Sequence, residues 1–454
     1  MKVKNCRICR SPDLELFLDL GKHPMADAFI EFDQLEEQEI LNPLEVCSCQ
    51  QCGLIQLSYV VPAEQLYDKN YIYESSITRM GQRHWTEFAK TAADIANLKT
   101  GELVLDIGSN VGVLLEKFRN LGATILGVDP APTIVDIAHN RGIETIKGFF
   151  DLEITHQIKK ERKPAKIITA TNVFAHIDDL HLLMKAIDDL LAKDGVFIVE
   201  APYILNLIKS LEYDTIYHEH LSYLSLKPMI TLFNKFQMEI FEVQQRDIHG
   251  GSVRCYVRRK SNTSLKVSNV IKDLLQLEQH SGIYQQSHLN QFAIKVADHR
   301  DHLTTLLKRL KAEGRKIAAV SAPAKGMTLL NYCGIGSDIL EFITEKSALK
   351  IGRYTPGQHI PIVTDEKLLE LQPDYALILA WNFAEEIMER LKLNMKIYVP
   401  SVTSERLNVL MGGIPTLDEP EKHAEFTRIV KLDPFEKAIK DLAPKLWISG
   451  IRQT

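Results

Sequence analysis

Residues 103–112 read LVLDIGSNVG and place a carboxylate beside two glycines. An apolar run ends near Asp106, the chain turns through Gly108 and Gly112, and apolar residues at helical spacing follow. This order predicts a strand, a tight turn and a helix, the unit that opens a doubly wound α/β domain. A second predicted strand ends at Asp129, whose carboxylate suits the two hydroxyls of a ribose. The stretch therefore predicts a site for an adenosine-containing cofactor.

The polar residues of this turn favour S-adenosylmethionine (SAM). A nicotinamide dinucleotide site prefers GxGxxG, whose backbone amides bind a pyrophosphate. Here Asp106 would repel a pyrophosphate and attract the amino group of SAM. The alternative is an ordinary α/β turn without a ligand, because short glycine turns are common. The residues expected to bind the cofactor are Asp106, Gly108, Ser109, Asn110, Asp129, Pro130, Phe150, Asn172, His176 and Ser76.

Length and composition limit the other possibilities. The 454 residues, 25% of them charged and 45% hydrophobic, suffice for several domains with buried cores. A net charge of -5 makes nucleic acid an unexpected partner. No apolar run reaches the ~18–20 residues of a membrane span. The N-terminus MKVKNCRICR lacks the apolar segment of a signal peptide, so we expect a cytoplasmic protein. We also expect a monomer or a homodimer.

Four cysteines in two CxxC motifs predict a zinc site. They are Cys6, Cys9, Cys49 and Cys52. Two such turns bring four thiolates to tetrahedral spacing, and a shell of four thiolates leaves no open position, so the metal should be structural. We interpret Cys47 as a spare thiol, although its spacing to Cys52 is an alternative, and His23 as a loop residue.

The segment Tyr217-His218-Glu219-His220 concentrates groups that could transfer protons. A histidine can act as a general base near pH 7, and a neighbouring carboxylate or tyrosine can orient it. We expect His220 to be the base, with Glu219 and Tyr217 assisting and His218 contacting the substrate. A metal site built on the two histidines, or an ordinary polar loop, are the alternatives.

The other residues expected to bind substrate are spread along the chain. Tyr71 and Tyr73 are polar aromatic residues that could line a pocket, and His249 and Arg254 flank the turn HGGSVR. Helical spacing over residues 265–313 precedes a second α/β unit, in which Lys325, Thr328 and Asn331 start a helix that could bind a diphosphate. Arg353 could add to that site. After residue 401 we find no motif to interpret.

In their order, these motifs resemble the SAM-dependent C-methyltransferases that build branched deoxysugars on nucleotide carriers. The resemblance covers residues 6 to about 400 and includes the cysteine pairs, DIGSN, TNVFAHIDDL, YHEH, HGGSVR, PAKGMTLLN and GRYTPGQHIPI. It implies a class I SAM-methyltransferase, Rossmann-like α/β domain between a zinc-binding domain and a C-terminal Rossmann-like α/β domain. We expect a zinc-binding domain at 1–66, a methyltransferase domain at 67–260, a helical linker at 261–312, a domain contacting the nucleotide sugar at 313–412 and a tail at 413–454. Val111 departs from the family, which usually has an acid there.

The resemblance implies methylation at C-3 of a 4-keto-deoxysugar linked to a nucleoside diphosphate, with dTDP as the expected carrier. A saturated carbon has no lone pair, so the keto group must acidify its neighbour and an enolate must form. Two alternatives stay open: O- or N-methylation of another small molecule, and a SAM-binding zinc protein without catalytic activity.

Overall fold

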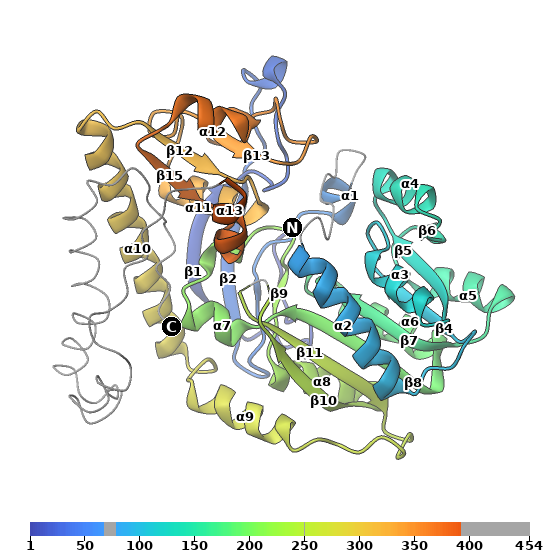
Figure 1. The fold of residues 1–454 in the computed structure, drawn as a ribbon. Helices are drawn as coiled ribbons and strands as arrows, with labels where there is room; N and C mark the ends of the chain where they lie inside the picture. Colours follow the sequence, from blue (N-terminus) through green and yellow to red (C-terminus); the bar gives the residue numbers. More distant parts are fainter. Residues whose placement is uncertain (68–78, 249, 392–454) are drawn as a thin grey trace, which may run out of the picture.

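The computed structural model describes residues 1–67, 79–248 and 250–391. Within these residues the chain forms three β-sheets, and the sheet of the N-terminal segment lies between the other two (Figure 1). Apolar side chains of the N-terminal and C-terminal sheets share one buried cluster, while Cys6, Cys49 and Cys52 pack into the cluster of the central sheet. The N-terminal segment is thus packed against both α/β units.

The central sheet has seven strands in the order β10-β11-β8-β7-β4-β5-β6. Their bounds are β4 Leu103–Ile107, β5 Thr124–Asp129, β6 Thr145–Lys147, β7 Ala165–Thr171, β8 Leu191–Pro202, β10 Met238–Arg246 and β11 Ser252–Arg259. Only β11 runs against its neighbours, because β8 and β10 both pair with it antiparallel. This order confirms the predicted class I SAM-methyltransferase architecture.

Helices pack around this sheet because their apolar residues recur at helical spacing. They are α2 Arg79–Ala96, α3 Val113–Asn120, α4 Pro132–Asn140, α5 Leu152–Glu161, α6 Leu180–Leu190, α7 Ile204–Lys209 and α8 Leu226–Lys235. Val111, at the start of this helical layer, is fully buried with Phe118 and Ile143. The valine at this position therefore serves the apolar core.

The N-terminal sheet contains a strand from the central part of the chain. Its order is β1 (Leu14–His23), β2 (Asn42–Cys49), β3 (Ile55–Leu57) and β9 (Ser222–Tyr223), all antiparallel. The short helices α1 (Ala63–Leu66) and η1 (Phe32–Gln34) flank it. Because β9 begins two residues after His220, the segment with the predicted base is anchored to the sheet of the cysteine motifs.

The C-terminal sheet is entirely parallel, in the order β14-β13-β12-β15. Its strands are β12 Ile317–Val320, β13 Ile343–Glu345, β14 Ile362–Thr364 and β15 Tyr375–Ile378, and its helices are α11 Ala324–Cys333, α12 Glu366–Leu371 and α13 Ala384–Leu391. Helices α9 (Val270–His280) and α10 (Gln286–Ala312) connect it to the central sheet, and α10 runs along the side of β1 (Figure 1). The two helices and the second α/β unit agree with the sequence pattern.

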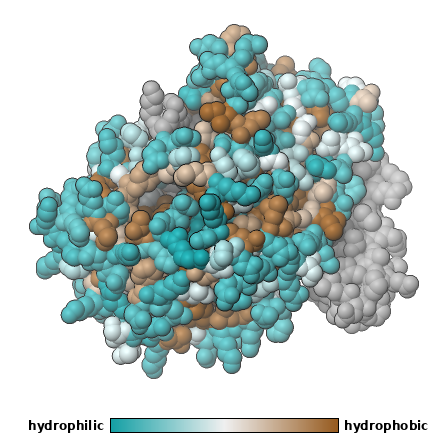
Figure 2. Space-filling view, turned by 180° about the vertical axis from the view of Figure 1, so that it is seen from behind, coloured by the Kyte–Doolittle hydropathy of each residue, from teal (hydrophilic) through white to brown (hydrophobic). Residues whose placement is uncertain are grey.

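On the face seen from behind, Figure 2 shows mostly hydrophilic side chains, with hydrophobic ones in patches between them. Among the described residues, no helix combines the length and the apolar character that crossing a membrane requires.

Candidate active site between two sheets

The turn after β4 forms the floor of the candidate cofactor site. Gly108 and Asn110 both adopt positive φ, at 65° and 49°. The Gly108 amide donates to the Val128 carbonyl at 2.8 Å, which ties the turn to β5. A Cβ atom at Gly108 would lie 2.7 Å from a methyl carbon of Val173. Glycine is therefore required there both by the backbone conformation and by the close approach of the neighbouring loop.

Two buried carboxylates stand at this edge of the sheet. Asp106 accepts a hydrogen bond from Thr169 Oγ1 at 2.5 Å, and burial raises its pKa to about 7. Asp129 accepts from the Asn110 amide at 2.9 Å and from the Ala131 amide at 3.0 Å. Burial also raises the pKa of Asp129. The backbone amides thus orient Asp129, and each oxygen keeps a lone pair for another donor.

Asn172, after β7, completes this edge with an unusual backbone conformation. Its φ is 55°, and its amide donates to the Glu200 carbonyl at 2.7 Å. Its Oδ1 is buried and has no hydrogen-bond partner in the described part of the chain. A buried acceptor without a partner is costly, so this atom is suited to a ligand donor.

His220 lies in the loop before β9, and a carbonyl fixes its tautomer. Nδ1 lies 2.7 Å from the Thr215 carbonyl oxygen, which can only accept, so Nδ1 carries the proton of the neutral ring. The remaining ring nitrogen, Nε2, then holds the lone pair needed by a base. The Tyr217 ring stands over His220, with centroids 3.9 Å apart and an interplanar angle of 34°.

His176 is the second histidine at this point. Its centroid is 4.9 Å from that of His220, and the Tyr67 hydroxyl lies 2.8 Å from His176 Nδ1. Burial is the main cause that holds the pKa of His176 well below its usual value, and the proximity of His220 lowers it further. His176 is therefore neutral near pH 7.

Glu219 is buried beside charged groups from both ends of the chain. Burial is the main cause that raises the pKa of Glu219 well above its usual value, and the carboxylate of Asp27 adds to it. The ammonium group of Lys350 lowers this pKa. Lys350 Nζ donates to the Ala322 carbonyl at 2.8 Å and lies 3.6 Å from Asp27 Oδ1. The protonated form of Glu219 is favoured, and a protonated carboxyl can donate a hydrogen bond.

These groups line one cavity of about 750 Å³. The carboxyl ends of the central and the C-terminal sheets both open into it, through Asp106, Asp129 and Asn172 on one side and Ser321 and Glu345 on the other. Ligands of parallel α/β sheets bind at this end of the strands. The predicted residues that line it are Asp106, Gly108, Ser109, Asn110, Asp129, Pro130, Phe150, Asn172, His176, Tyr217, Glu219, His220 and Lys325.

The C-terminal side of the cavity carries several cations. They are Lys325, Lys346, Lys350 and Arg390. Lys325 Nζ donates to Asn382 Oδ1 and stands 4.0 Å from the centre of the Trp381 ring. This side of the cavity is suited to an anionic group.

Five residues predicted to bind substrate do not line the cavity. His218 and Arg254 are buried elsewhere, and their partners belong to the fold. The His218 ring contacts the carbonyls of Asn42 and Pro43, each at 3.3 Å. Arg254 Nε binds Glu200 Oε2 at 2.6 Å.

The other three contact neighbouring segments. Thr328 donates to the Ile216 carbonyl at 2.9 Å, and Asn331 donates to the carbonyl of Pro356 at 3.1 Å. Arg353 pairs with Glu31 at 2.9 Å. Polar side chains that bind backbone or acids of another segment look the same in sequence as ligand-binding ones. Tyr71, Tyr73, Ser76 and His249 lie outside the described residues.

Tyr67, which belongs to the same tyrosine-rich stretch as Tyr71 and Tyr73, also lines the cavity, as do Asp27 and Glu345, which sequence reasoning missed. Glu345 is the last residue of strand β13 in the second α/β unit. Its position at the carboxyl end of a parallel strand is a sequence signal from which it could have been predicted. Asp27 lies in a segment without a motif, and only packing brings it to the site.

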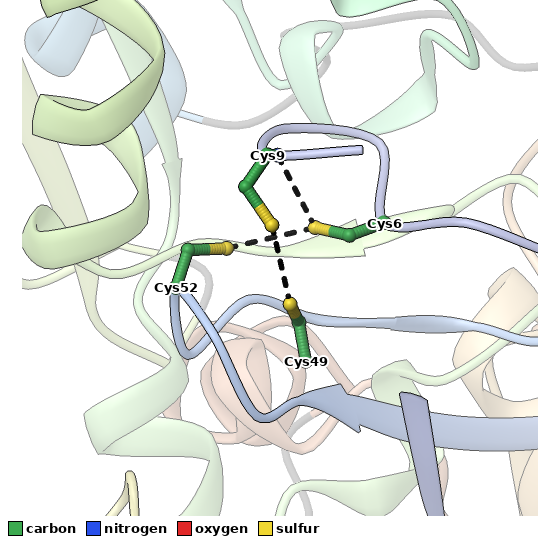
Figure 3. A group of neighbouring side chains, drawn as sticks. All are labelled: Cys6, Cys9, Cys49 and Cys52. Atoms are coloured by element: carbon green, nitrogen blue, oxygen red, sulfur yellow. Dashed lines mark hydrogen bonds between the residues drawn. The ribbon is translucent and has the colours of Figure 1, made fainter. Parts of the chain in front are cut away.

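The four predicted cysteines form one cluster away from this cavity. Their Sγ atoms all lie within 4.8 Å of one another, with Cys6 and Cys52 at 3.5 Å and Cys9 and Cys49 at 3.4 Å. All four thiols point toward a common centre (Figure 3). Cys47 Sγ instead donates to the Gln56 carbonyl, and His23 contacts the Leu20 carbonyl. Both therefore stand outside the cluster, as predicted, but His23 is the buried last residue of strand β1 and not the loop residue that we expected.

Comparison with known proteins agrees with this arrangement. Three family models match in order: "Putative zinc binding domain" at residues 6–67, "Methyltransferase domain" at 78–243 and "C-methyltransferase C-terminal domain" at 247–398. The C-methyltransferase NovU of Streptomyces niveus is 33% identical over 390 residues, which is 86% of this chain and 92% of NovU. The chain belongs to the C-methyltransferase family.

The last part of this C-methyltransferase has a different relative. Residues 366–454 match a phosphoadenosine phosphosulfate reductase domain model. The phosphoadenosine 5'-phosphosulfate reductase of Synechococcus is 29% identical over 93 residues, and the match spans 18% of this chain and 40% of that protein. Among solved structures, magnesium protoporphyrin IX methyltransferase from Synechocystis with bound SAM covers 43% of this chain and 89% of its own, at 12% identity and a TM-score of 0.31.

The residues of this C-methyltransferase fit both SAM and zinc, the cofactor and the metal that the family implies. The central domain has the SAM-binding methyltransferase fold, and the unpartnered Oδ1 of Asn172 offers an acceptor to a cofactor. Tetrahedral zinc with bonds of about 2.3 Å would separate its sulfur ligands by about 3.8 Å. The observed contacts of 3.4 and 3.5 Å are close to this value and far from a disulfide bond.

Proposed function

We propose that this C-methyltransferase methylates C-3 of a 4-keto-deoxysugar carried on a nucleoside diphosphate, with dTDP as the expected nucleotide, in branched-sugar biosynthesis. One observation carries the proposal: His220, with its tautomer fixed by Thr215, lies in a cavity between the Asp106 turn and the cations near Lys325. The cavity volume of about 750 Å³ is within the range of about 300–1,000 Å³ for small-molecule sites. Its two sides differ in charge, which suits two ligands of different chemistry.

The side with Asp106 and Asp129 is proposed to bind SAM. Asp129 would accept hydrogen bonds from the ribose hydroxyls, and Asp106 would attract the amino group. Gly108, Ser109, Asn110, Pro130 and Phe150 would form the remaining contacts, with Asn172 and His176 at the strand end. When bound, SAM supplies an electrophilic methyl group, and the protein supplies its placement.

The chain's own residues would generate the carbon nucleophile. His220 Nε2 takes the proton from C-3, and the electron pair of that C–H bond moves toward the keto group to give an enolate. Glu219, favoured in its protonated form, can donate a hydrogen bond to the oxygen where negative charge develops. Tyr217 holds the His220 ring by stacking. The hydrogen on C-3 is thereby replaced by a methyl group.

The cations on the other side would bind the diphosphate. Lys325 is proposed to contact it directly, with Lys346 nearby, while Lys350 and Arg390 already pair with Asp27 and Asp365. An ammonium group binds phosphate oxygens by charge-assisted hydrogen bonds.

The test is incubation of the purified protein with SAM carrying a ¹³C-methyl group and a panel of dTDP- and UDP-linked 4-keto-6-deoxyhexoses. Mass spectrometry should show a gain of about 15 mass units with the labelled methyl group, or about 14 with unlabelled SAM, and incubation in D₂O should exchange the C-3 hydrogen through the enolate. NMR coupling of the labelled methyl carbon to ring carbons identifies a new carbon–carbon bond. Transfer to oxygen or nitrogen, or no transfer and no exchange despite SAM binding, would contradict the proposal.

A further inference from the structure

Arg7 lies inside the first cysteine motif, yet its side chain points away from the thiols toward the active-site segments. The side chain is 2% exposed, so its charge is almost completely removed from water. Its Nε donates to Asp178 Oδ1 at 3.0 Å. Its Nη1 lies 3.1 Å from both the Leu57 and the Leu221 carbonyl oxygens. One guanidinium thus binds three separate segments.

Two of these segments hold the histidine pair. Asp178 is two residues after His176, and Leu221 directly follows His220. The Leu221 carbonyl also accepts from the Leu57 amide at 3.0 Å, where β9 joins β3. Arg7 therefore bridges the backbone after one ring to the side chain beside the other.

The cysteine motif itself is held firmly by the central domain. The Ile8 carbonyl accepts hydrogen bonds from His181 Nε2 at 2.8 Å and from Lys235 Nζ at 3.0 Å. The Arg7 amide donates to Gln56 Oε1 at 2.9 Å. The backbone is therefore held at the Arg7 amide and at the Ile8 carbonyl, which fixes the point from which the Arg7 side chain extends to the active-site segments.

We propose that Arg7 is a positioning residue, which sets the spacing of His176 and His220 and so couples the four-cysteine site to catalysis. The inference rests on the proposed role of His220. A planar guanidinium can donate along several directions at once, whereas the ammonium group of lysine is a compact charge on a flexible stem. Lysine at position 7 could keep the positive charge but would not hold both segments. A misplacement of about 1 Å can reduce turnover by about a hundredfold.

The experiment compares Arg7→Lys with Arg10→Lys in the full-length protein. Arg10 is a matched control because it follows the same motif and pairs with Asp179 at 2.8 Å, but 46% of its side chain is exposed. For Arg7→Lys we expect bound zinc and SAM affinity within twofold of the parent, and kcat per SAM-binding site lower by about 10- to 100-fold. Arg10→Lys should keep kcat within twofold.

Asp178→Asn provides a second variant that leaves the cysteine motif unchanged. It removes the charge opposite Arg7 at a residue that is 58% exposed, so it should fold even where Arg7→Lys does not. We expect kcat per SAM-binding site to fall by about three- to tenfold, since the carbonyl contacts of Arg7 remain. Zinc loss in Arg7→Lys, or parent kcat in both variants, would overturn the proposal.

A readout without any acceptor separates this inference from the proposed function. Nitrogen-15 NMR of the histidine rings reports the tautomer of His220 and its surroundings directly. In Arg7→Lys the signals of His176 and His220 should shift or broaden, while those of exposed His156 stay unchanged. Unchanged rings would overturn the role of Arg7 even if the parent methylates no sugar, and shifted rings would support it in the same case.

Discussion

The rings of His176 and His220 lie 4.9 Å apart between centroids, with their planes inclined at 55°. They come from two segments, one after β7 and one before β9, and each ring has its own hydrogen-bond partner. Because burial holds the pKa of His176 well below its usual value, this ring is a weak base, and His220 is the ring of the pair that we propose to take the proton. The relation places the proposed base between the two strand edges that form the cavity.

Replacing His220 by Asn should remove the base and keep a polar side chain of similar reach. We expect kcat to fall by about 10²- to 10⁴-fold, the usual contribution of a general base. SAM affinity, measured by calorimetry, should change less than threefold, and C-3 exchange in D₂O should disappear. His156→Asn on the surface of α5 is the matched control. Turnover near the parent value in His220→Asn would exclude this role.

SAM affinity should depend on pH through Asp106. Burial raises the pKa of its carboxyl to about 7, and the ionised form is the one that attracts an amino group. The ionised fraction falls about tenfold per pH unit below the pKa, so SAM binding should weaken by up to that factor per unit between pH 7 and 5. Calorimetry across this range checks the slope. Asp106→Asn should bind SAM weakly and without the slope; an unchanged slope would assign the pH dependence to another group.

The free energy of unfolding of the ligand-free protein should also depend on pH through Asp106. In the unfolded chain this carboxyl titrates near its ordinary value of 3.8, so between about pH 4 and 7 the folded state binds more protons than the unfolded state. The contribution of Asp106 to the free energy of unfolding is therefore fully present below pH 4 and declines as pH rises to about 7. In ligand-free protein, Asp106→Asn should flatten this part of the stability profile.

Cys49→Ser should lower zinc content and stability, because it removes one of four converging thiols. Loss of a structural zinc site should reduce the melting temperature and, through β3 and β9, the transferase activity. Cys47→Ser is the matched control, since Cys47 binds the Gln56 carbonyl instead. Elemental analysis should find one zinc per chain in Cys47→Ser and less in Cys49→Ser. Equal zinc in both variants would contradict the four-cysteine assignment.

Lys325→Met should weaken the binding of the nucleotide sugar and leave SAM affinity unchanged. A hydrogen bond to a charged group contributes about 1.5–3 kcal/mol, so KM for the sugar nucleotide should rise about 10- to 100-fold. Lys367→Met, at an exposed residue paired with Glu370 on α12, is the control. A KM within twofold of the parent value would place the diphosphate elsewhere in the cavity.

The sequence by itself determined the elements whose signals are local. The CxxC pairs predicted a thiol cluster because ligand spacing within each turn is set by a few bonds. The run ending at Asp106 and the turn at Gly108 predicted a strand, a turn and a helix, because burial and positive φ are properties of short segments. These signals were sufficient for the fold class and for the strand edge at Asp106 that lines the cavity.

Only the tertiary structure decided which polar residues face the cavity. Arg254 and His218 were predicted to bind the substrate, but their partners, Glu200 and the carbonyls of Asn42 and Pro43, lie far along the chain. Arg7 likewise meets Leu221 across 214 positions. A buried polar group must find a partner wherever packing supplies one, and no local pattern encodes that choice.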